Sequence, residues 1–273
     1  MDYLKVDNWR KLPELKRLKD ASPSPKELFY FGKWDKNIFK NCVAIVGSRR
    51  MTNYGKTVLQ KMIPKLVFEG KTIISGFMYG VDQYTHQLCL DNGGKTIAVL
   101  GWGITYPLSS YDLKLAKEII SKGGLLLSEW ENQKPLLWTF PVRNRIVAAL
   151  SQEVIIIEAA HKSGSLITAN LAVALKRRLW AVPGPITSTV SEGTNELIAS
   201  GKAQAWLGKS PINKKTAVNK DPVLSLLQNE ALTADEMARQ LNVPVSQIGA
   251  QLSIFTLTGE VMEKGGKYYL NEE

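Results

Sequence analysis

Short apolar runs alternate with longer amphipathic stretches through most of the chain, which has 273 residues. Runs of this length that are rich in β-branched residues are typical of buried parallel strands. Six of them span residues 43–46, 72–74, 96–100, 124–127, 153–157 and 179–182. Between them, apolar residues recur at helical spacing in residues 54–68, 80–92, 110–122, 144–150 and 166–176. The alternation predicts a doubly wound α/β domain with a mostly parallel sheet.

We place this domain at residues 40–208, between segments with different patterns. Residues 1–39 contain three prolines and several aromatic residues. We expect a short segment that packs onto the domain and has no long helix. Residues 209–221 are polar and rich in lysine and asparagine, which is typical of a linker.

Residues 222–273 show the pattern of a small winged-helix domain. Three short helical stretches precede two strand-like runs, which are joined by Gly265 and Gly266. Adjacent glycines between such runs favour a hairpin turn, here the wing.

The net charge of +10 is distributed unevenly between the two domains. Residues 221–273 contain three basic and eight acidic side chains, whereas the rest of the chain contains 32 basic and 17 acidic ones. The basic part favours a polyanionic partner. By contrast, residues 244–258, the recognition stretch of the winged helix, contain no lysine or arginine. A regulator that reads duplex DNA through this domain is therefore disfavoured.

Several other classes of protein are disfavoured by what the sequence lacks. No apolar run approaches the roughly 20 residues that span a bilayer, and the N-terminus has no signal-peptide core, so we expect a cytoplasmic protein with no membrane partner. Cys42 and Cys89 form no CxxC motif, and we expect no metal site. Neither a GxxxxGK[ST] loop nor a complete GxGxxG is found, and we expect no cofactor.

Glycine, hydroxyl and basic side chains follow three of the predicted strands. The loops after the first, second and fifth strands contain Gly47, Ser48, Arg49 and Arg50, then Ser75 and Gly76, then Lys162, Ser163, Gly164, Ser165 and Thr168. Ligands of open parallel sheets bind outside the carboxyl ends of the strands. Together these loops indicate a phosphate-binding edge, although any one of them could be only a turn.

A basic and aromatic cluster lies at the start of the helix before the fifth strand. It contains Lys134, Trp138, Phe140, Arg143, Asn144 and Arg145. Cations that follow phosphates and rings that stack on bases are typical of single-stranded nucleic-acid binding. The alternatives are that either arginine pairs with Glu129 or Glu158, and that Phe140 and Trp138 belong to the core.

For two further residues we favour a structural role. Asp82 precedes His86 by one helical turn, and we expect a histidine held by this carboxylate on a helix face. Glu158 follows a predicted strand, but no nucleophile or metal cluster accompanies it. Because no Ser-His-Asp order or HExxH is found, we expect no catalytic residue.

Six ordered motifs resemble those of the DNA-processing protein A (DprA/Smf) family. They are Gly47-Ser48-Arg49, Ser75-Gly76 with Gly80-Val81-Asp82, Phe140-Pro141-x-Arg143-Asn144-Arg145, and residues 163–169, 181–184 and 192–198. The resemblance extends from about residue 29 to residue 206. Many members begin with a helix-hairpin-helix-like domain, and the residues before Lys40 are too few for a full one.

The resemblance implies an extended Rossmann-like domain that binds single-stranded DNA, dimerises, and helps to load the RecA recombinase during natural transformation. It implies a binding protein and not an enzyme, with a homodimer interface in the late part of the domain, near residues 171–206. The alternative is a nucleotide-processing enzyme of the phosphoribohydrolase type, which has a related fold.

The candidate DNA-binding residues combine the three loops with the basic and aromatic cluster. They are Gly47, Ser48, Arg49, Arg50, Ser75, Gly76, Lys134, Phe140, Arg143, Asn144, Arg145, Lys162, Ser163, Gly164, Ser165 and Thr168. By resemblance to the family, Arg49 is the strongest single candidate for holding a backbone phosphate.

Overall fold

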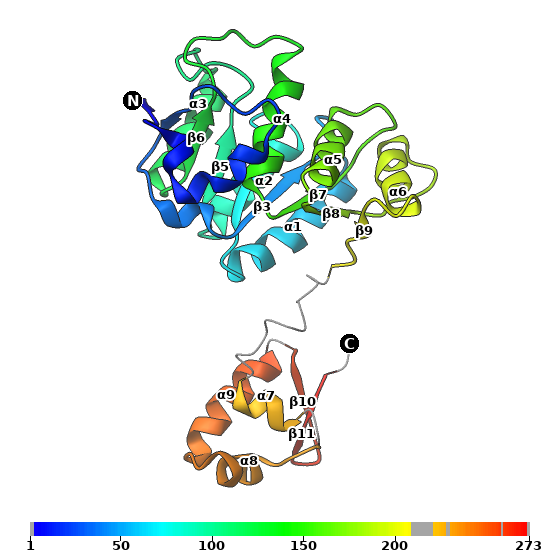
Figure 1. The fold of residues 1–273 in the computed structure, drawn as a ribbon. Coiled ribbons are helices and arrows are strands. Elements are labelled where there is room, and N and C mark those ends of the chain that lie inside the picture. The colour runs from blue at the N-terminus through cyan, green and yellow to red at the C-terminus, as the bar shows by residue number, and fades with distance from the viewer. Residues whose placement is uncertain (1–2, 209–220, 228–229, 258, 272–273) are drawn as a thin grey trace. The chain divides into compact units, whose positions relative to one another are not determined.

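The computed structural model describes residues 3–208, 221–227, 230–257 and 259–271 (Figure 1). The chain divides into two compact units, Met1–Ser210 and Pro211–Glu273. All of the predicted linker except Asp221 lies outside the described residues.

A sheet of nine strands, in the order β1-β2-β6-β5-β4-β3-β7-β8-β9, is the centre of the first unit as described. The strands are β1 (Leu4–Lys5), β2 (Phe29–Phe31), β3 (Cys42–Val46), β4 (Thr72–Ser75), β5 (Thr96–Val99), β6 (Leu125–Ser128), β7 (Glu153–Ile156), β8 (Arg178–Ala181) and β9 (Gln204–Ala205). From β6 to β9 in that order, neighbouring strands are parallel. The pairs β1–β2 and β2–β6 are antiparallel. The prediction of a mostly parallel sheet is confirmed.

Helices cover both faces of this sheet (Figure 1). The α-helices in the described part of the first unit are α1 (Asn53–Phe68), α2 (Val81–Asp91), α3 (Ser110–Ser121), α4 (Thr139–Leu150), α5 (Gly164–Ala174) and α6 (Glu192–Ala199). Strand residues alternate between the two faces, so that in β3 Val43 and Ile45 pack with α1, whereas Ala44 and Val46 pack with α4 and α5. All five residues of β3 are buried, which explains why its sequence reads as one continuous apolar run.

The strand order reverses beside β3. The chain moves from β3 outward through β4, β5 and β6, then returns to the other side of β3 with β7, β8 and β9. The loops that follow β3 and β7 therefore diverge from neighbouring strands, which creates a crevice at their carboxyl ends. This is the edge at which the candidate loops were predicted.

The N-terminal segment belongs to the same unit. It contains three 3₁₀ helices, η1 (Trp9–Lys11), η2 (Pro13–Asp20) and η3 (Lys36–Phe39). Leu15 and Leu18 of η2 are fully buried in the core that includes α4. Strand β2 extends the sheet by pairing with β6, which the sequence analysis did not predict.

The second unit has three helices and a two-stranded wing in its described residues. They are α7 (Pro222–Leu227), α8 (Ala234–Leu241), α9 (Val245–Leu257), β10 (Val261–Lys264) and β11 (Lys267–Leu270). Thr233 and Glu236 form a reciprocal capping box at the start of α8. Gly265 and Gly266, both with positive φ, join the two strands, and the predicted winged-helix fold is confirmed. Across the described parts of both units, every helix is too short or too polar to cross a membrane.

Candidate nucleic-acid interface

A cleft of about 510 Å³ lies at the carboxyl ends of β3, β4 and β7. Twelve of the sixteen candidate residues line it. They are Gly47, Ser48, Arg49, Arg50, Gly76, Phe140, Arg143, Asn144, Ser163, Gly164, Ser165 and Thr168. Segments that are more than 100 residues apart in sequence thus form one site, as the positions of the loops after the strands predicted.

The loop after β3 is fixed against the start of α2. The amide of Val81 donates to the carbonyl of Ser48 at 3.1 Å, and the amide of Arg50 donates to Oγ of Ser48 at 3.0 Å. Gly80 adopts a φ of +88°, and a Cβ there would overlap the carbonyl oxygens of Ser48 and Arg49. Glycine at position 80 therefore permits the loop conformation that presents Arg49.

Arg49 is exposed at the mouth of the cleft. Its guanidinium carbon lies 5.1 Å from the ring centroid of Phe140, a cation–π contact. Among the described residues it has no carboxylate within ion-pair distance. A phosphate can therefore bind this guanidinium without first displacing a protein partner.

Arg143 is a second cation of the cleft, and it is buried. Its Nη1 donates to the carbonyl of Val99. Across Gly76 from it lies Asp82, which accepts hydrogen bonds from Oγ of Ser75 at 3.0 Å and from the amide of Met78 at 3.3 Å. A Cβ on Gly76 would overlap both the carboxylate and the guanidinium, so the glycine makes room for the two charges.

Burial disfavours the charged forms of Arg143 and Asp82, and the attraction between the two side chains partly offsets this cost. It lowers the pKa of Arg143 and raises the pKa of Asp82, while the attraction between them opposes both shifts. The repulsion between Arg49 and Arg143 adds to the lowering of the Arg143 pKa. An anion that contacts both arginines would offset that repulsion.

The N-terminus of α5 supplies the third side of the cleft. Oγ of Ser163 caps the helix by accepting from the amide of Ser165 at 3.3 Å. Nδ2 of Asn144 donates to the carbonyl of Gly164 at 3.4 Å, which ties α4 to this turn. A helix N-terminus attracts anions through its free amides and its dipole.

Three of the other candidate residues lie outside the cleft lining. Ser75 is fully buried, and its single hydroxyl proton is shared between the carbonyl of Ile45 at 2.6 Å and Oδ1 of Asp82 at 3.0 Å, so it supports Asp82 from beneath. Lys134 and Lys162 are exposed on the neighbouring surface. Their cationic side chains remain candidates for phosphates further along a strand.

Arg145 is buried away from the cleft. It forms a two-point ion pair with Glu129, with Nη1–Oε1 at 2.6 Å and Nη2–Oε2 at 2.5 Å, and its Nε donates to the carbonyl of Pro23. The structure thus supports the alternative of an ion-paired arginine for this residue. Arg145 holds α4 to the N-terminal segment and does not line the cleft, so the prediction that it contacts DNA is not supported.

Comparison with known proteins identifies the family. The family model described as DNA recombination-mediator protein A matches residues 8–217, and that of the DprA winged helix domain matches residues 210–267. The chain belongs to the DNA recombination-mediator protein A family. The resemblance found in the sequence motifs is confirmed.

Two curated relatives illustrate the similarity. Protein Smf of Escherichia coli (strain K12) is 33% identical over 249 residues, which cover 83% of this chain and 67% of that protein. DNA processing protein DprA of Streptococcus pneumoniae is 38% identical over 216 residues, which cover 73% and 75%.

Two solved structures of the family are similar to this one. The X-ray structure of the Streptococcus pneumoniae protein has a TM-score of 0.66 at 35% identity and covers 75% of this chain and 70% of that chain. The structure of the Helicobacter pylori protein, described as giving insight into its single-stranded DNA binding mode, has a TM-score of 0.66 at 31% identity and covers 84% and 98%.

Eight residues that line the cleft were not binding candidates in the sequence analysis: Val46, Met78, Tyr79, Asp82, Leu137, Pro141, Ala160 and Val190. Leu137 is 90% exposed and Tyr79 is 57% exposed. An aromatic residue inside a glycine-punctuated loop, as in Ser75–Gly80, was the signal for Tyr79. Nothing in the local sequence marked Leu137, which lies two residues after Pro135 in an irregular segment.

Glu158 and His86 have structural roles, but the partner predicted for His86 was wrong. Glu158 accepts hydrogen bonds from the amide and hydroxyl of Thr52 at the start of α1. The imidazole of His86 bonds to Oγ1 of Thr96 and to the carbonyl of Gly76, both at 2.7 Å, and not to Asp82. His86 therefore positions the glycine beneath the cleft. No group of three or more metal-ligating side chains occurs in the part of the chain that the structure describes.

We expect the first unit to lose about 2 kcal/mol of stability between pH 7 and pH 5 because of His86. Burial lowers its pKa from 6.5 to about 4. The unfolded chain therefore takes up a proton in this window while the folded chain does not, so stability falls as the pH falls. All seven tryptophans lie at or before Trp206, so urea unfolding followed by tryptophan fluorescence reports on this unit.

The matched variants are His86→Gln and His161→Gln, because His161 is exposed and is the other histidine of the chain. The first should flatten the pH dependence by about 2 kcal/mol, whereas the second leaves the buried imidazole of His86 in place and should retain that contribution. Equal pH profiles for His86→Gln and the unmodified protein would contradict the role assigned to His86.

Proposed function

We propose that the chain binds single-stranded DNA, protects incoming DNA, and helps to load the RecA recombinase in natural transformation or recombination. The observation that best supports it is the cleft itself. The exposed Arg49, the buried Arg143 and the N-terminus of α5 all face one space of about 510 Å³. This arrangement suits the phosphates of a nucleic-acid backbone.

Apolar groups at the same cleft favour a single strand over a duplex. Tyr79, Leu137 and Phe140 line it beside the cations, and the first two are largely exposed. Unpaired bases can stack on such side chains, whereas the bases of a duplex are already stacked on each other. Helix α9 of the winged unit has no lysine or arginine, so a major-groove reader is not favoured there.

The remaining parts of the proposal rest on membership of the family. We propose a cytoplasmic homodimer that uses the late part of the domain, near residues 171–206, with RecA as a further partner. We also propose that the chain is not an enzyme and needs no cofactor. Among the described residues that line the cleft, Asp82 is the one acidic residue. Hydrogen bonds from Ser75 and Met78 hold its carboxylate in place. Release of free base from nucleoside monophosphates would instead support the phosphoribohydrolase alternative.

Gel shifts with the full-length protein at several salt concentrations test the proposal. Single strands should bind at least about tenfold more tightly than a duplex of the same sequence. If three phosphates are neutralised, log K should fall with log[salt] with a slope of about −2. Equal affinity for single and double strands, or a slope near zero, would overturn the proposal.

A further inference from the structure

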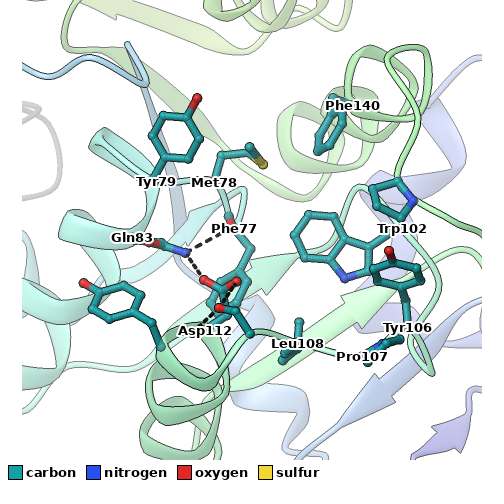
Figure 2. A pocket seen from close by; sticks show the side chains of 13 residues that line it. Phe77, Met78, Tyr79, Gln83, Trp102, Tyr106, Pro107, Leu108, Asp112 and Phe140 are labelled. Atoms are coloured by element: carbon teal, nitrogen blue, oxygen red, sulfur yellow. Dashed lines mark hydrogen bonds between the residues drawn. The ribbon is translucent and has the colours of Figure 1, made fainter.

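A second pocket, of about 450 Å³, adjoins the cleft on the side of β5 and α3. Six of its thirteen lining residues are aromatic, namely Phe77, Tyr79, Trp102, Tyr106, Tyr111 and Phe140. Figure 2 shows Trp102, Tyr106 and Phe140 on one side of the pocket and Gln83 and Asp112 on the other. The pocket is thus a slot with apolar walls and a polar end.

The pocket is continuous with the phosphate-binding cleft. Met78, Tyr79 and Phe140 line both. One ring links them physically, because Phe140 lies 5.1 Å from the guanidinium carbon of Arg49 and 6.1 Å, edge to face, from the ring of Trp102. A base next to a phosphate bound by Arg49 is therefore within reach of the pocket.

The polar end of the pocket presents hydrogen-bond acceptors. The Asp112 carboxylate accepts from Nε2 of Gln83 at 2.6 Å and from Oγ of Ser109 at 2.8 Å. A carboxylate has about four lone-pair positions, so two remain for other donors. Nε2 of Gln83 is already used for Asp112 and the carbonyl of Phe77, which leaves its oxygen.

We propose that this pocket binds one unpaired base of the strand held in the cleft and prefers a base with an exocyclic amino group. The aromatic walls match the faces of a base. The amino group of cytosine can donate to Asp112, whereas at the same position thymine has a carbonyl oxygen, which the carboxylate repels. This inference rests on the proposed binding of single-stranded DNA and adds a site of base selection to it.

Binding of equal-length oligo(dC) and oligo(dT) to the full-length protein, measured by fluorescence anisotropy at mildly alkaline pH, tests it. The unmodified protein should bind oligo(dC) about fivefold more tightly. Asp112→Asn should reduce this preference to less than about twofold, because the amide can also donate to thymine. Tyr111→Ala should weaken binding of both oligonucleotides about tenfold, because it removes one stacking ring.

Phe68→Ala is the matched control for Tyr111→Ala. Phe68 is 94% exposed at the end of α1 and Tyr111 is 69% exposed, so neither substitution empties the core, and Phe68→Ala should leave both affinities unchanged. Deoxycytidine monophosphate should not displace bound oligo(dC) at comparable concentrations, because the site takes a base of a strand and not a free nucleotide.

The outcomes separate the pocket from the proposed function. If the protein binds neither oligonucleotide, single-stranded DNA binding itself fails. If it binds both but shows no preference, if the preference persists in Asp112→Asn, or if Tyr111→Ala behaves like Phe68→Ala, the pocket inference is overturned and the cleft stands. Displacement by the free nucleotide would likewise overturn it.

Discussion

Arg49→Glu is expected to weaken single-stranded DNA binding about 100-fold. The unmodified guanidinium is exposed, has no carboxylate partner among the described residues, and lies over Phe140 at the mouth of the cleft. A charge-assisted hydrogen bond of this kind contributes about 1.5–3 kcal/mol, and reversing the charge adds repulsion of the phosphate. Anisotropy titration with a labelled oligonucleotide measures the effect.

The control for this variant is Lys117→Glu on α3. It makes the same change in net charge at an exposed position that lines neither the cleft nor the adjoining pocket. We expect it to cost less than about threefold, since exposed charges beyond a Debye length are largely screened. Both variants should unfold at the same urea concentration as the unmodified protein. If Arg49→Glu loses no more affinity than Lys117→Glu, Arg49 does not contact the DNA.

The position of the cleft was predictable because parallel strands all end at the same edge. Once the runs around residues 43–46, 72–74 and 153–157 are recognised as parallel strands, the polar groups after each of them must approach one another. The order of the strands in the sheet then shows where neighbouring loops diverge, which is beside β3. This information is not local: it depends on the chain's return from β6 to β7, which no single motif encodes.

Helix geometry predicts that Arg143 and Arg145 have different roles. Which of the two faces the cleft could be determined only from the folded structure. Two positions along a helix rotate a side chain by about 200°, so these residues point to opposite sides. One side faces the cleft, and the other faces Glu129 and the carbonyl of Pro23. Because the N-terminal segment supplies that second side across more than 100 residues of sequence, the sequence alone left both possibilities open.

The short antiparallel strands at the sheet edge were not predictable from periodicity. β2 is three residues long, Phe29–Phe31, and its burial is incomplete. Alternation over three residues carries too little signal to distinguish a strand from an aromatic loop. β2 pairs with the edge of β6 that does not face β5. The position of β2 is therefore determined by tertiary structure.

Gly80→Ala is expected to destabilise the first unit by about 4 kcal/mol and to weaken DNA binding about tenfold. Gly80 has φ +88° and ψ −132°, a backbone region that costs a residue with a Cβ about 1–3 kcal/mol. The new methyl would also overlap the carbonyls of Ser48 and Arg49, and relief of the overlap requires the loop that presents Arg49 to move. Urea unfolding by tryptophan fluorescence and anisotropy titration measure the two effects.

Gly93→Ala is the control that separates the two costs of Gly80→Ala, backbone strain and overlap of the methyl group with the Ser48–Arg49 loop. Gly93 also has a positive φ, +73°, but a Cβ there would meet no atom within 4 Å. It should cost about 1–2 kcal/mol, as expected for a left-handed alanine, and leave DNA affinity unchanged. If Gly80→Ala costs no more than Gly93→Ala, or if it destabilises the unit and yet binds DNA normally, the close packing of residue 80 on the Ser48–Arg49 backbone does not determine how Arg49 is presented.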